Sequence, residues 1–181
     1  ENISLMMGKN CHVVIYPINK NKELNIVCII REKKYDPDNI KSLVGKVIAQ
    51  NSDLEKVFEG DLKSWPLYFT PQILPSSNSK VFYIGDAFNG FLPTLAQGAG
   101  QSIESAYELF NLLNEDKTDI QNVYFKERLK RAKIVRKRSN LNFFVFHFSS
   151  PVMQIIRNFF MKFLVKRKSF ISSYLGSVYK N

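Results

Sequence analysis

Residues 11–16 and 24–31 are two short runs in which apolar side chains alternate with other residues. A polar segment, residues 19–23, separates the two runs. Because successive side chains of a strand point to opposite faces of the sheet, this pattern predicts an antiparallel β-hairpin with one apolar face. That face would carry Cys11, Val13, Ile15, Leu24, Ile26, Cys28 and Ile30.

The middle of the chain combines helical spacing with a short apolar run. Residues 37–60 predict two short helical pieces, and residues 81–84 show no alternation, which is typical of a strand covered on both faces of a layered α/β sheet. Apolar residues recur at helical spacing from Gly98 to Leu113. The loop between this strand and helix therefore exceeds the usual length of about 2–6 residues, and such long loops often carry function.

Two more helices are predicted in the last third of the chain. The first has Lys and Arg on its other faces and an apolar stripe of Phe125, Leu129, Ala132 and Val135. The second begins at Pro151, with Ser149 or Ser150 as its cap. Arg157 and Lys162 interrupt the apolar sequence that follows, so no run reaches the roughly 20 apolar residues that a bilayer-spanning helix needs.

The helix that begins at Pro151 has an apolar face with two alternative roles. It packs on the body of the protein, or it lies on a membrane surface, where Lys162 and the basic residues 166–168 would favour binding. We favour packing because large apolar helix faces are most often core, and packing predicts that Phe159 and Phe163 are buried. The face consists of Val152, Ile155, Ile156, Phe159, Phe163 and Leu164.

Composition excludes several classes of protein. The chain has 181 residues, of which 45% are hydrophobic and 23% are charged, which excludes a disordered chain, a collagen-like repeat and a coiled coil. Two cysteines, Cys11 and Cys28, are too few for a disulfide framework or a cysteine zinc site. We expect two reduced, half-buried thiols in a cytoplasmic protein. The first residue is Glu1, which favours a fragment of a longer protein.

The net charge of +10 is concentrated in one part of the chain. Residues 126–168 hold 13 of the 26 Lys and Arg and a single acidic residue, Glu127. Such a block can face phosphate, anionic lipid or water. No nucleic-acid motif accompanies it, and no aromatic residues occupy base-stacking positions on a sheet, so we expect no nucleic-acid partner.

Several common catalytic patterns do not occur in the sequence. Spacing supports neither a Ser/His/Asp arrangement nor a metal-ligand motif, so we predict no metal. His12 and His147 each stand alone in an apolar run, and we interpret both as structural. The glycines Gly98 and Gly100 lack the third glycine of a dinucleotide-binding turn and lie well past the end of the strand.

The segment 81–105 contains the strongest candidate site. Asp86 follows the predicted strand at its carboxyl end, where ligands bind in open α/β sheets and a carboxylate can accept hydrogen bonds from hydroxyl groups. Gly98 and Gly100 begin the next helix, where free N–H groups and the helix dipole favour an electron-rich ligand. Taken singly, each of these residues is better explained by a tight turn with an Asp cap.

Together these residues resemble a specific motif. The segment is similar to the second FAD-binding motif of the single-component (class A) FAD-dependent aromatic-ring monooxygenases, the salicylate hydroxylase-like and para-hydroxybenzoate hydroxylase-like flavoproteins. Looser similarity runs from about residue 8 to residue 165. The motif residues are Gly85, Asp86, Ala87, Leu92, Pro93, Ala96, Gln97, Gly98, Ala99 and Glu104.

The resemblance implies a fold and a domain order. The expected fold is α/β (α+β), as the C-terminal half of a three-layer FAD/NAD(P)-binding fold with part of an antiparallel substrate-domain sheet and C-terminal helices. Residues 1–75 would complete the substrate domain, residues 76–116 would hold the FAD motif, and residues 117–181 would form basic C-terminal helices. The family's N-terminal Gly-x-Gly-x-x-Gly turn does not occur here, so the chain should expose faces that the other half would cover.

The resemblance also implies roles for individual residues. Gly85 and Asp86 would bind FAD, with the Asp86 carboxylate on the ribityl chain. The Pro93 loop would lie along the flavin, and the backbone of Gly98, Ala99 and Gly100 would face its pyrimidine end. No catalytic side chain is assigned.

The implied reaction is hydroxylation of an aromatic or related small substrate. NAD(P)H would reduce FAD, and O2 would be captured as a flavin hydroperoxide. The fragment alone would be inactive, and the oligomeric state stays open. Two positions depart from the family pattern: its Ala-His is Phe88-Asn89 here, and its Glu-Asp is Glu104-Ser105.

Two alternatives to this function stay open. The first is a non-catalytic or peripheral membrane-binding domain whose basic C-terminal helices are the functional part. The second is a related flavoprotein reductase that acts on isoprenoid lipids.

Overall fold

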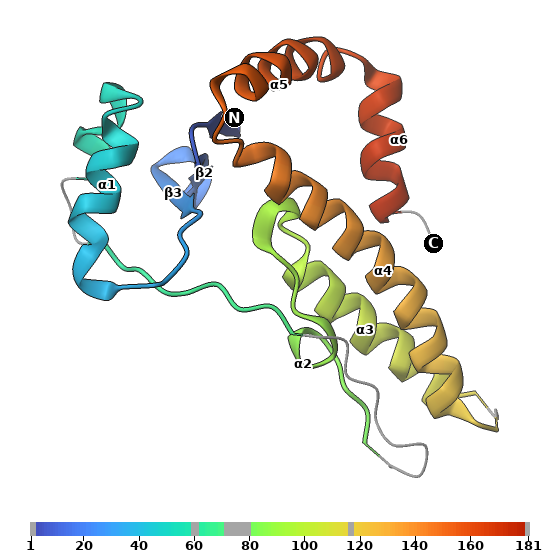
Figure 1. Cartoon of the computed structure of the whole chain (residues 1–181). Helices are drawn as coiled ribbons and strands as arrows, with labels where there is room; N and C mark the ends of the chain where they lie inside the picture. Colours follow the sequence, from blue (N-terminus) through green and yellow to red (C-terminus); the bar gives the residue numbers. More distant parts are fainter. Residues whose placement is uncertain (1–2, 59–61, 71–80, 116–117, 180–181) are drawn as a thin grey trace. The chain divides into compact units, whose positions relative to one another are not determined.

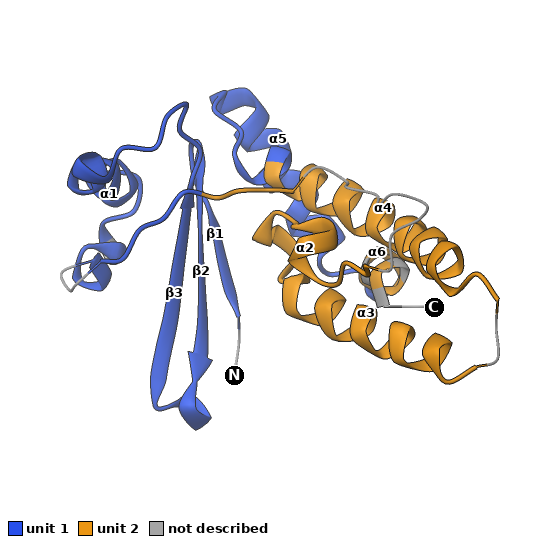
Figure 2. Cartoon of the chain, turned by 90° about the horizontal axis from the view of Figure 1, so that it is seen from below, with its two compact units in different colours: residues 1–66, 144–168 blue, residues 67–143, 169–181 orange. Residues whose placement is uncertain are grey.

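The computed structural model describes residues 3–58, 62–70, 81–115 and 118–179. The chain divides into two compact units, which are coloured separately in Figure 2. Unit 1 comprises residues 1–66 and 144–168, and unit 2 comprises residues 67–143 and 169–181. The domain boundaries expected from the sequence, at 75/76 and 116/117, fall on residues outside the described ranges, so that division stays a prediction.

Unit 1 contains a three-stranded antiparallel sheet in the order β1 (Ser4–Met7), β2 (Cys11–Ile18), β3 (Glu23–Ile30). The predicted hairpin is confirmed, since Val13 pairs with Cys28 and Ile15 pairs with Ile26. The four residues of β1 are too few to show an alternating pattern, and the sequence analysis did not predict this strand.

The hairpin turn explains the polar segment between the two runs. Asn19, Lys20 and Asn21 form one turn of 3-10 helix, η1 (Asn19–Asn21), and all three have positive φ angles between 47° and 66°. Asn adopts this left-handed conformation more readily than most residues because its short polar side chain can bond locally. The segment Asn-Lys-Asn therefore suits a tight connection between β2 and β3.

The predicted apolar face of the hairpin forms the core of unit 1. Cys11 and Val13 are buried against Val47 of α1 (Ile40–Ile48) and Leu54 of η3 (Ser52–Leu54). Leu24 is the exception: it pairs with Pro17 near the turn and is 63% exposed. The partly buried members of this core are Met6, Ile15, Ile26, Cys28, Ile30, Val57 and Phe58.

The helical pieces predicted within residues 37–60 are confirmed. Besides α1 and η3 they comprise η2 (Pro37–Asn39) and η4 (Lys56–Phe58). The Asp36 side chain caps the first of them, since its carboxylate accepts a hydrogen bond from the backbone N–H of Asp38 at 3.0 Å.

Unit 2 is mainly helical. Its elements are α2 (Asp86–Asn89), η5 (Pro93–Leu95), α3 (Gly98–Leu113), the part of α4 (Ile120–Phe146) up to residue 143, and α6 (Lys168–Tyr179) from residue 169. Figure 1 shows α3 and α4 side by side. The predicted bounds of α3 are confirmed, and so is the apolar stripe of α4, since Phe125, Ala132 and Val135 are buried.

The strand predicted at residues 81–84 is wrong. These residues are extended but belong to no strand of the described chain. Phe82 and Tyr83 pack against the core of unit 2, while Val81 and Ile84 are exposed. A buried parallel strand needs partner strands on its edges, and none of the described residues pairs with this segment. Its apolar character predicts burial and leaves the pairing partner undetermined.

Helix α5 (Pro151–Leu164) begins as predicted but does not pack as predicted. Pro151 occupies the first turn and Ser150 is the N-cap. Phe159 is 71% exposed and Phe163 is 52% exposed, so the prediction that both are buried is wrong. The side of α5 that is covered carries Arg157, which is buried. Among the described residues, none of the helices is long and apolar enough to cross a membrane.

Helix α3 also leaves apolar residues uncovered. Ile103, Tyr107, Phe110 and Leu113 lie at helical spacing and are all exposed. The buried residues of α3 are Gln101, Ser105 and Leu112. The apolar stripe of α3 is therefore not covered by any of the described residues.

Candidate functional site

The predicted site residues come together where α2 and α3 begin. Asp86 is the first residue of α2, and Gly98 is the first residue of α3. A Cβ atom at Gly98 would lie 4.0 Å from the Asp86 Oδ1 atom, so the carboxylate stands directly beside the start of α3. The Asp86 side chain is exposed and available to a ligand.

Gly85 allows this approach of the loop to α3. Its φ angle is +56°, a conformation that residues with a Cβ rarely adopt. A Cβ atom at this position would also lie 2.6 Å from the Oγ atom of Ser102 on α3. Glycine is therefore required here both for the backbone conformation and for the space between loop and helix.

The amino terminus of α3 presents free backbone donors. The first backbone hydrogen bond of this helix is donated by the N–H of Gln101 to the Gln97 carbonyl, at 2.8 Å. The N–H groups of Gly98, Ala99 and Gly100 precede it and have no acceptor in the helix. The side chain of the N-cap residue Gln97 makes no capping hydrogen bond. The start of α3, with these N–H groups and the positive end of the helix dipole, therefore lies beside Asp86.

The loop between α2 and α3 is anchored to α4. Pro93 begins η5, and the hydroxyl of Thr94 donates to the Ser139 carbonyl at 2.7 Å. The side-chain amide of Asn142 donates to the Thr94 carbonyl at 3.2 Å. The loop closes through Ala96, whose φ angle is +51°. These two hydrogen bonds therefore attach the Pro93 loop to α4.

The departure Phe88-Asn89 from the family pattern is accommodated by the core. Phe88 packs in the apolar cluster of unit 2, and Asn89 is buried. The guanidinium of Arg136 donates to the Asn89 Oδ1 atom and, at 2.7 Å, to the Thr70 carbonyl. The Thr70 hydroxyl donates to the Asp86 carbonyl at 2.9 Å and accepts from the Gly90 N–H at 2.7 Å.

Sequence reasoning missed the contribution of Thr70 and Arg136 to this loop. They lie 66 residues apart in the chain, and neither belongs to a motif of its own. Only the fold brings both to the backbone that carries Asp86. No sequence signal in a single chain identifies such a pair, because hydrogen bonds to backbone carbonyls place little demand on residue type.

The second departure, Glu104-Ser105, has a simple structural explanation. Ser105 is buried on α3, and its hydroxyl donates to the Gln101 carbonyl at 2.6 Å, one turn earlier. Glu104 accepts hydrogen bonds from Arg128 at 3.1 Å and from Arg131 at 2.9 Å, both on α4. Glu104 therefore ties α3 to α4.

The two histidines, each of which stands alone in an apolar run of the sequence, are paired in the folded chain. The His12 Nδ1 atom lies 3.1 Å from the His147 Nε2 atom, although 135 residues separate them in the sequence. His147 Nε2 also lies 3.3 Å from the Ile29 carbonyl oxygen, which can only accept, so a proton on this nitrogen would serve both contacts, with His12 Nδ1 as an acceptor. Burial and the neighbouring His147 lower the pKa of His12 to about 4.

The lowered pKa of His12 predicts a loss of stability on mild acidification. The unfolded chain takes up a proton on His12 below its ordinary pKa of 6.5, while the folded chain does so only near 4. The contribution to stability is therefore fully present above about pH 6.5 and is lost as the pH falls toward 4. Between pH 7 and pH 5 we expect this residue to account for a loss of about 2 kcal/mol.

Urea unfolding at a series of pH values measures this loss. In the matched variant His12→Asn the side-chain carbonyl can replace the Nδ1 acceptor and does not titrate in this range. The difference in unfolding free energy between the two proteins should shrink as the pH falls. A parallel pH dependence in the two proteins would contradict the prediction.

The cysteines offer no reactive thiol. Cys11 is buried and Cys28 is half-buried, and both are free. Burial raises the pKa of Cys28 to about 12 and also raises that of Cys11, so both stay protonated at neutral pH. Within the described ranges there is no cluster of three or more His, Cys, Asp or Glu residues that could hold a metal ion.

Several of the proteins that match this chain in sequence are monooxygenases or hydroxylases. No family model matches the sequence. The 3-amino-4-hydroxybenzoate 2-monooxygenase PtnB3 of Streptomyces platensis is 27% identical over 164 residues, which cover 84% of this chain and 41% of the relative. The FAD-dependent monooxygenase cfoG of Aspergillus candidus is 32% identical over 145 residues, which cover 71% of this chain and 33% of the relative. A salicylate hydroxylase of Pseudomonas putida is 25% identical over 133 residues, which cover 66% of this chain and 30% of the relative.

These relatives confirm the resemblance inferred from residues 85–104. The chain spans less than half of the length of each of them. Among solved structures, a salicylate hydroxylase substrate complex matches with a TM-score of 0.63 and 18% sequence identity, covering 99% of this chain and 50% of that chain. At this identity the match establishes the fold. Together with the antiparallel sheet, it confirms the expected mixed α and β class.

Proposed function

Because the chain is related in sequence to the FAD-dependent aromatic-ring monooxygenases and shares the fold of a salicylate hydroxylase, we propose that it supplies the second part of the FAD site in such an enzyme. The observation that carries this proposal is the Asp86 carboxylate beside the uncapped amino terminus of α3. Hydroxyl donors and an electron-rich ring edge are complementary to this combination of groups.

The residues of the site fit FAD in shape as well as in charge. Gly98 and Gly100 leave open space, since a Cβ atom would meet nothing closer than 4.0 Å at Gly98 and 3.9 Å at Gly100. The backbone can therefore approach a flat ligand closely. Asp86 would accept hydrogen bonds from the ribityl hydroxyls, and the N–H groups of residues 98–100 would donate to the pyrimidine end of the flavin.

When bound, FAD would supply the redox chemistry: the flavin would take electrons from NAD(P)H and activate O2 for hydroxylation of an aromatic or related small substrate. The amino terminus of α3 would stabilise negative charge on the reduced ring through its N–H groups. The anchored Pro93 loop would hold the ring in place and exclude water from one side. These roles are binding and positioning, and we assign no acid or base to this chain.

We propose that binding of the whole FAD molecule also needs a further part of the enzyme. A turn for the AMP half of FAD, of the Gly-x-Gly-x-x-Gly type, does not occur in these 181 residues. We therefore propose that the chain by itself does not turn over substrate. The cytoplasmic location is part of the same proposal.

Removal of the Asp86 carboxylate should weaken FAD retention. In the product of the complete gene, Asp86→Ala would remove a charge-assisted hydrogen bond to the cofactor, which is worth about 1.5–3 kcal/mol. This loss corresponds to roughly a 10–150-fold weaker affinity for FAD. Flavin absorbance after gel filtration, and titration of the apoprotein with FAD by fluorescence quenching, measure the effect.

Two further variants make this test specific. Asp86→Asn retains an acceptor oxygen but no charge, so its affinity for FAD should lie between those of Asp86→Ala and the unmodified protein. Asp38→Ala removes an exposed carboxylate of unit 1 and should leave FAD retention unchanged. Equal flavin content in Asp86→Ala and in the unmodified protein would overturn the assignment of Asp86.

A further inference from the structure

Helix α5 exposes an apolar face on unit 1. Val152 is 64% exposed and Ile155 is 70% exposed, and Phe159 and Phe163 continue the same face. These four residues recur at intervals of three and four positions, so they line one side of the helix. They lie outside the proposed FAD site at residues 85–100.

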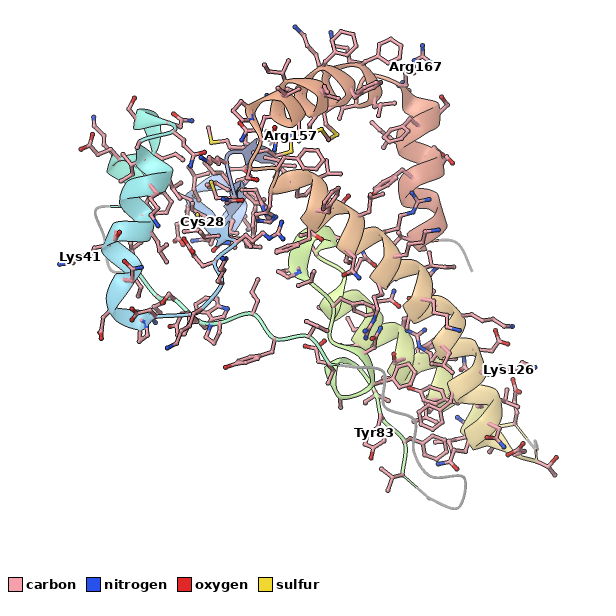
Figure 3. The ribbon with its side chains drawn as sticks, viewed as in Figure 1. Cys28, Lys41, Tyr83, Lys126, Arg157 and Arg167 are labelled. Atoms are coloured by element: carbon pink, nitrogen blue, oxygen red, sulfur yellow. The ribbon has the colours of Figure 1, made fainter. Side chains whose placement is uncertain are left out.

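Polar contacts fix which side of α5 faces the body of unit 1. Arg157 is 4% exposed, and its guanidinium donates to the Phe146 carbonyl at 3.2 Å and to the Met7 carbonyl at 3.1 Å. Gln154, one turn earlier, donates to the Phe148 carbonyl at 2.9 Å. Figure 3 labels Arg157 within α5. Turning the apolar face inward would break these bonds and leave the carbonyls without their donor. The apolar face therefore stays outward.

Basic side chains border this face toward the end of the helix. Lys162 follows Phe159 by three positions and lies beside it on the helix surface, and Lys166 lies just past the end of the helix. The Arg167 guanidinium lies 4.1 Å from the centre of the Phe163 ring. Residues 128–181 contain no Asp or Glu, so no acidic side chain of this segment offsets the charge.

We propose that α5 lies flat on an anionic lipid surface. Its exposed phenylalanines would enter the boundary between headgroups and acyl chains, and Lys162, Lys166 and Arg167 would contact the negative headgroups. A helix of 14 residues is too short to span a bilayer, but its length suits a position in the plane of the interface. A second copy of the chain is the less favourable occupant, because its α5 would bring the same positive charges together.

Vesicle sedimentation of the full chain tests this proposal. The full chain should bind vesicles of phosphatidylcholine that contain phosphatidylserine, and should bind pure phosphatidylcholine vesicles much more weakly. The triple variant Lys162→Gln, Lys166→Gln, Arg167→Gln should bind the anionic vesicles roughly a hundredfold more weakly, at about fivefold per charge. The double variant Phe159→Ser, Phe163→Ser should lose at least about tenfold in affinity.

Matched control variants test whether vesicle binding depends on the α5 surface itself or on any exposed lysines and any exposed apolar side chain. Lys20→Gln, Lys22→Gln, Lys34→Gln removes three exposed lysines elsewhere in unit 1, and Phe110→Ser removes an exposed phenylalanine of α3. Both controls should bind like the unmodified chain. Because all the altered side chains are exposed, the thermal unfolding of each variant should match that of the unmodified chain, and the two α5 variants test the surface independently.

The outcomes decide between the possible occupants of the surface. Loss of anionic-vesicle binding in both α5 variants, with binding retained in both controls, supports the proposal. Absence of vesicle binding by the full chain overturns it, as does equal binding to neutral and anionic vesicles. A dimer in sedimentation equilibrium that Phe159→Ser, Phe163→Ser dissociates would also overturn it, because a second copy would then cover the face.

Discussion

Replacement of Arg128 by Met should lower the free energy of unfolding by about 3–5 kcal/mol. Arg128 is 3% exposed, and its guanidinium bridges α4 to α3. It donates to Glu104 at 3.1 Å, to Glu108 at 3.0 Å and to the Gln101 side-chain oxygen at 2.9 Å. Methionine fills much of the volume but removes the guanidinium that donates to Glu108 and to a buried amide oxygen, while Glu104 keeps Arg131.

Urea denaturation followed by circular dichroism measures this effect, with two comparison variants. Lys130→Met removes an exposed cation on the same helix that bonds only Glu127 at 2.7 Å in the described chain, and should change stability by less than about 1 kcal/mol. Arg128→Lys keeps the charge but cannot reach all three acceptors at once, so its stability should be intermediate. Equal stability of Arg128→Met and Lys130→Met would contradict the role assigned to Arg128.

Arg157→Met should destabilise the protein by about 3–4 kcal/mol for a different reason. Arg157 has no carboxylate within salt-bridge distance among the described residues, and its charge instead serves backbone carbonyls. Val145 and Phe146 belong to the last turn of α4, and their carbonyl oxygens accept from Arg157 at 3.4 and 3.2 Å. These are the groups that a helix leaves without partners at its carboxyl end, where the dipole also favours a cation. Arg157 therefore caps α4.

The control for this prediction lies on the same helix. Lys162→Met changes an exposed cation of α5 and should leave the unfolding free energy nearly unchanged, because no described residue depends on its ammonium group. Amide hydrogen exchange adds a local measurement: in Arg157→Met the last turn of α4 should exchange faster than in the unmodified protein. Unchanged stability together with unchanged exchange at this turn would show that Arg157 is not the cap.

The periodicity of the sequence predicted where helices and strands occur more reliably than it predicted which of their faces are buried. The alternation at residues 11–16 and 24–31 identified the paired strands, because one covered face requires apolar residues at every second position. The spacing from Gly98 to Leu113 identified α3, and Pro151 identified the start of α5. Strand β1 and the 3-10 turns are too short to show a period, and the sequence pattern did not reveal them individually.

The candidate site could be recognised in the sequence because its residues meet local requirements of the backbone. Glycines and an aspartate at fixed spacing around a loop reflect backbone requirements, such as the positive φ angle of Gly85 and the open start of α3 at Gly98. Such requirements are local, so one chain displays them. The hydrogen bonds of Thr70 and Arg136 that support the Asp86 loop are not local, and only the folded chain displays them.

What only the tertiary structure decided was which side of each helix is covered. The sequence by itself determined that α3 and α5 are amphipathic, but in both helices the apolar stripe is exposed and polar residues are buried, Gln101 in α3 and Arg157 in α5. The pairing of His12 with His147 across 135 residues is of the same kind. A buried polar group is stable when partners satisfy its hydrogen bonds, and those partners come from distant segments. Periodicity reports that a face is apolar, whereas the fold decides what, if anything, covers it.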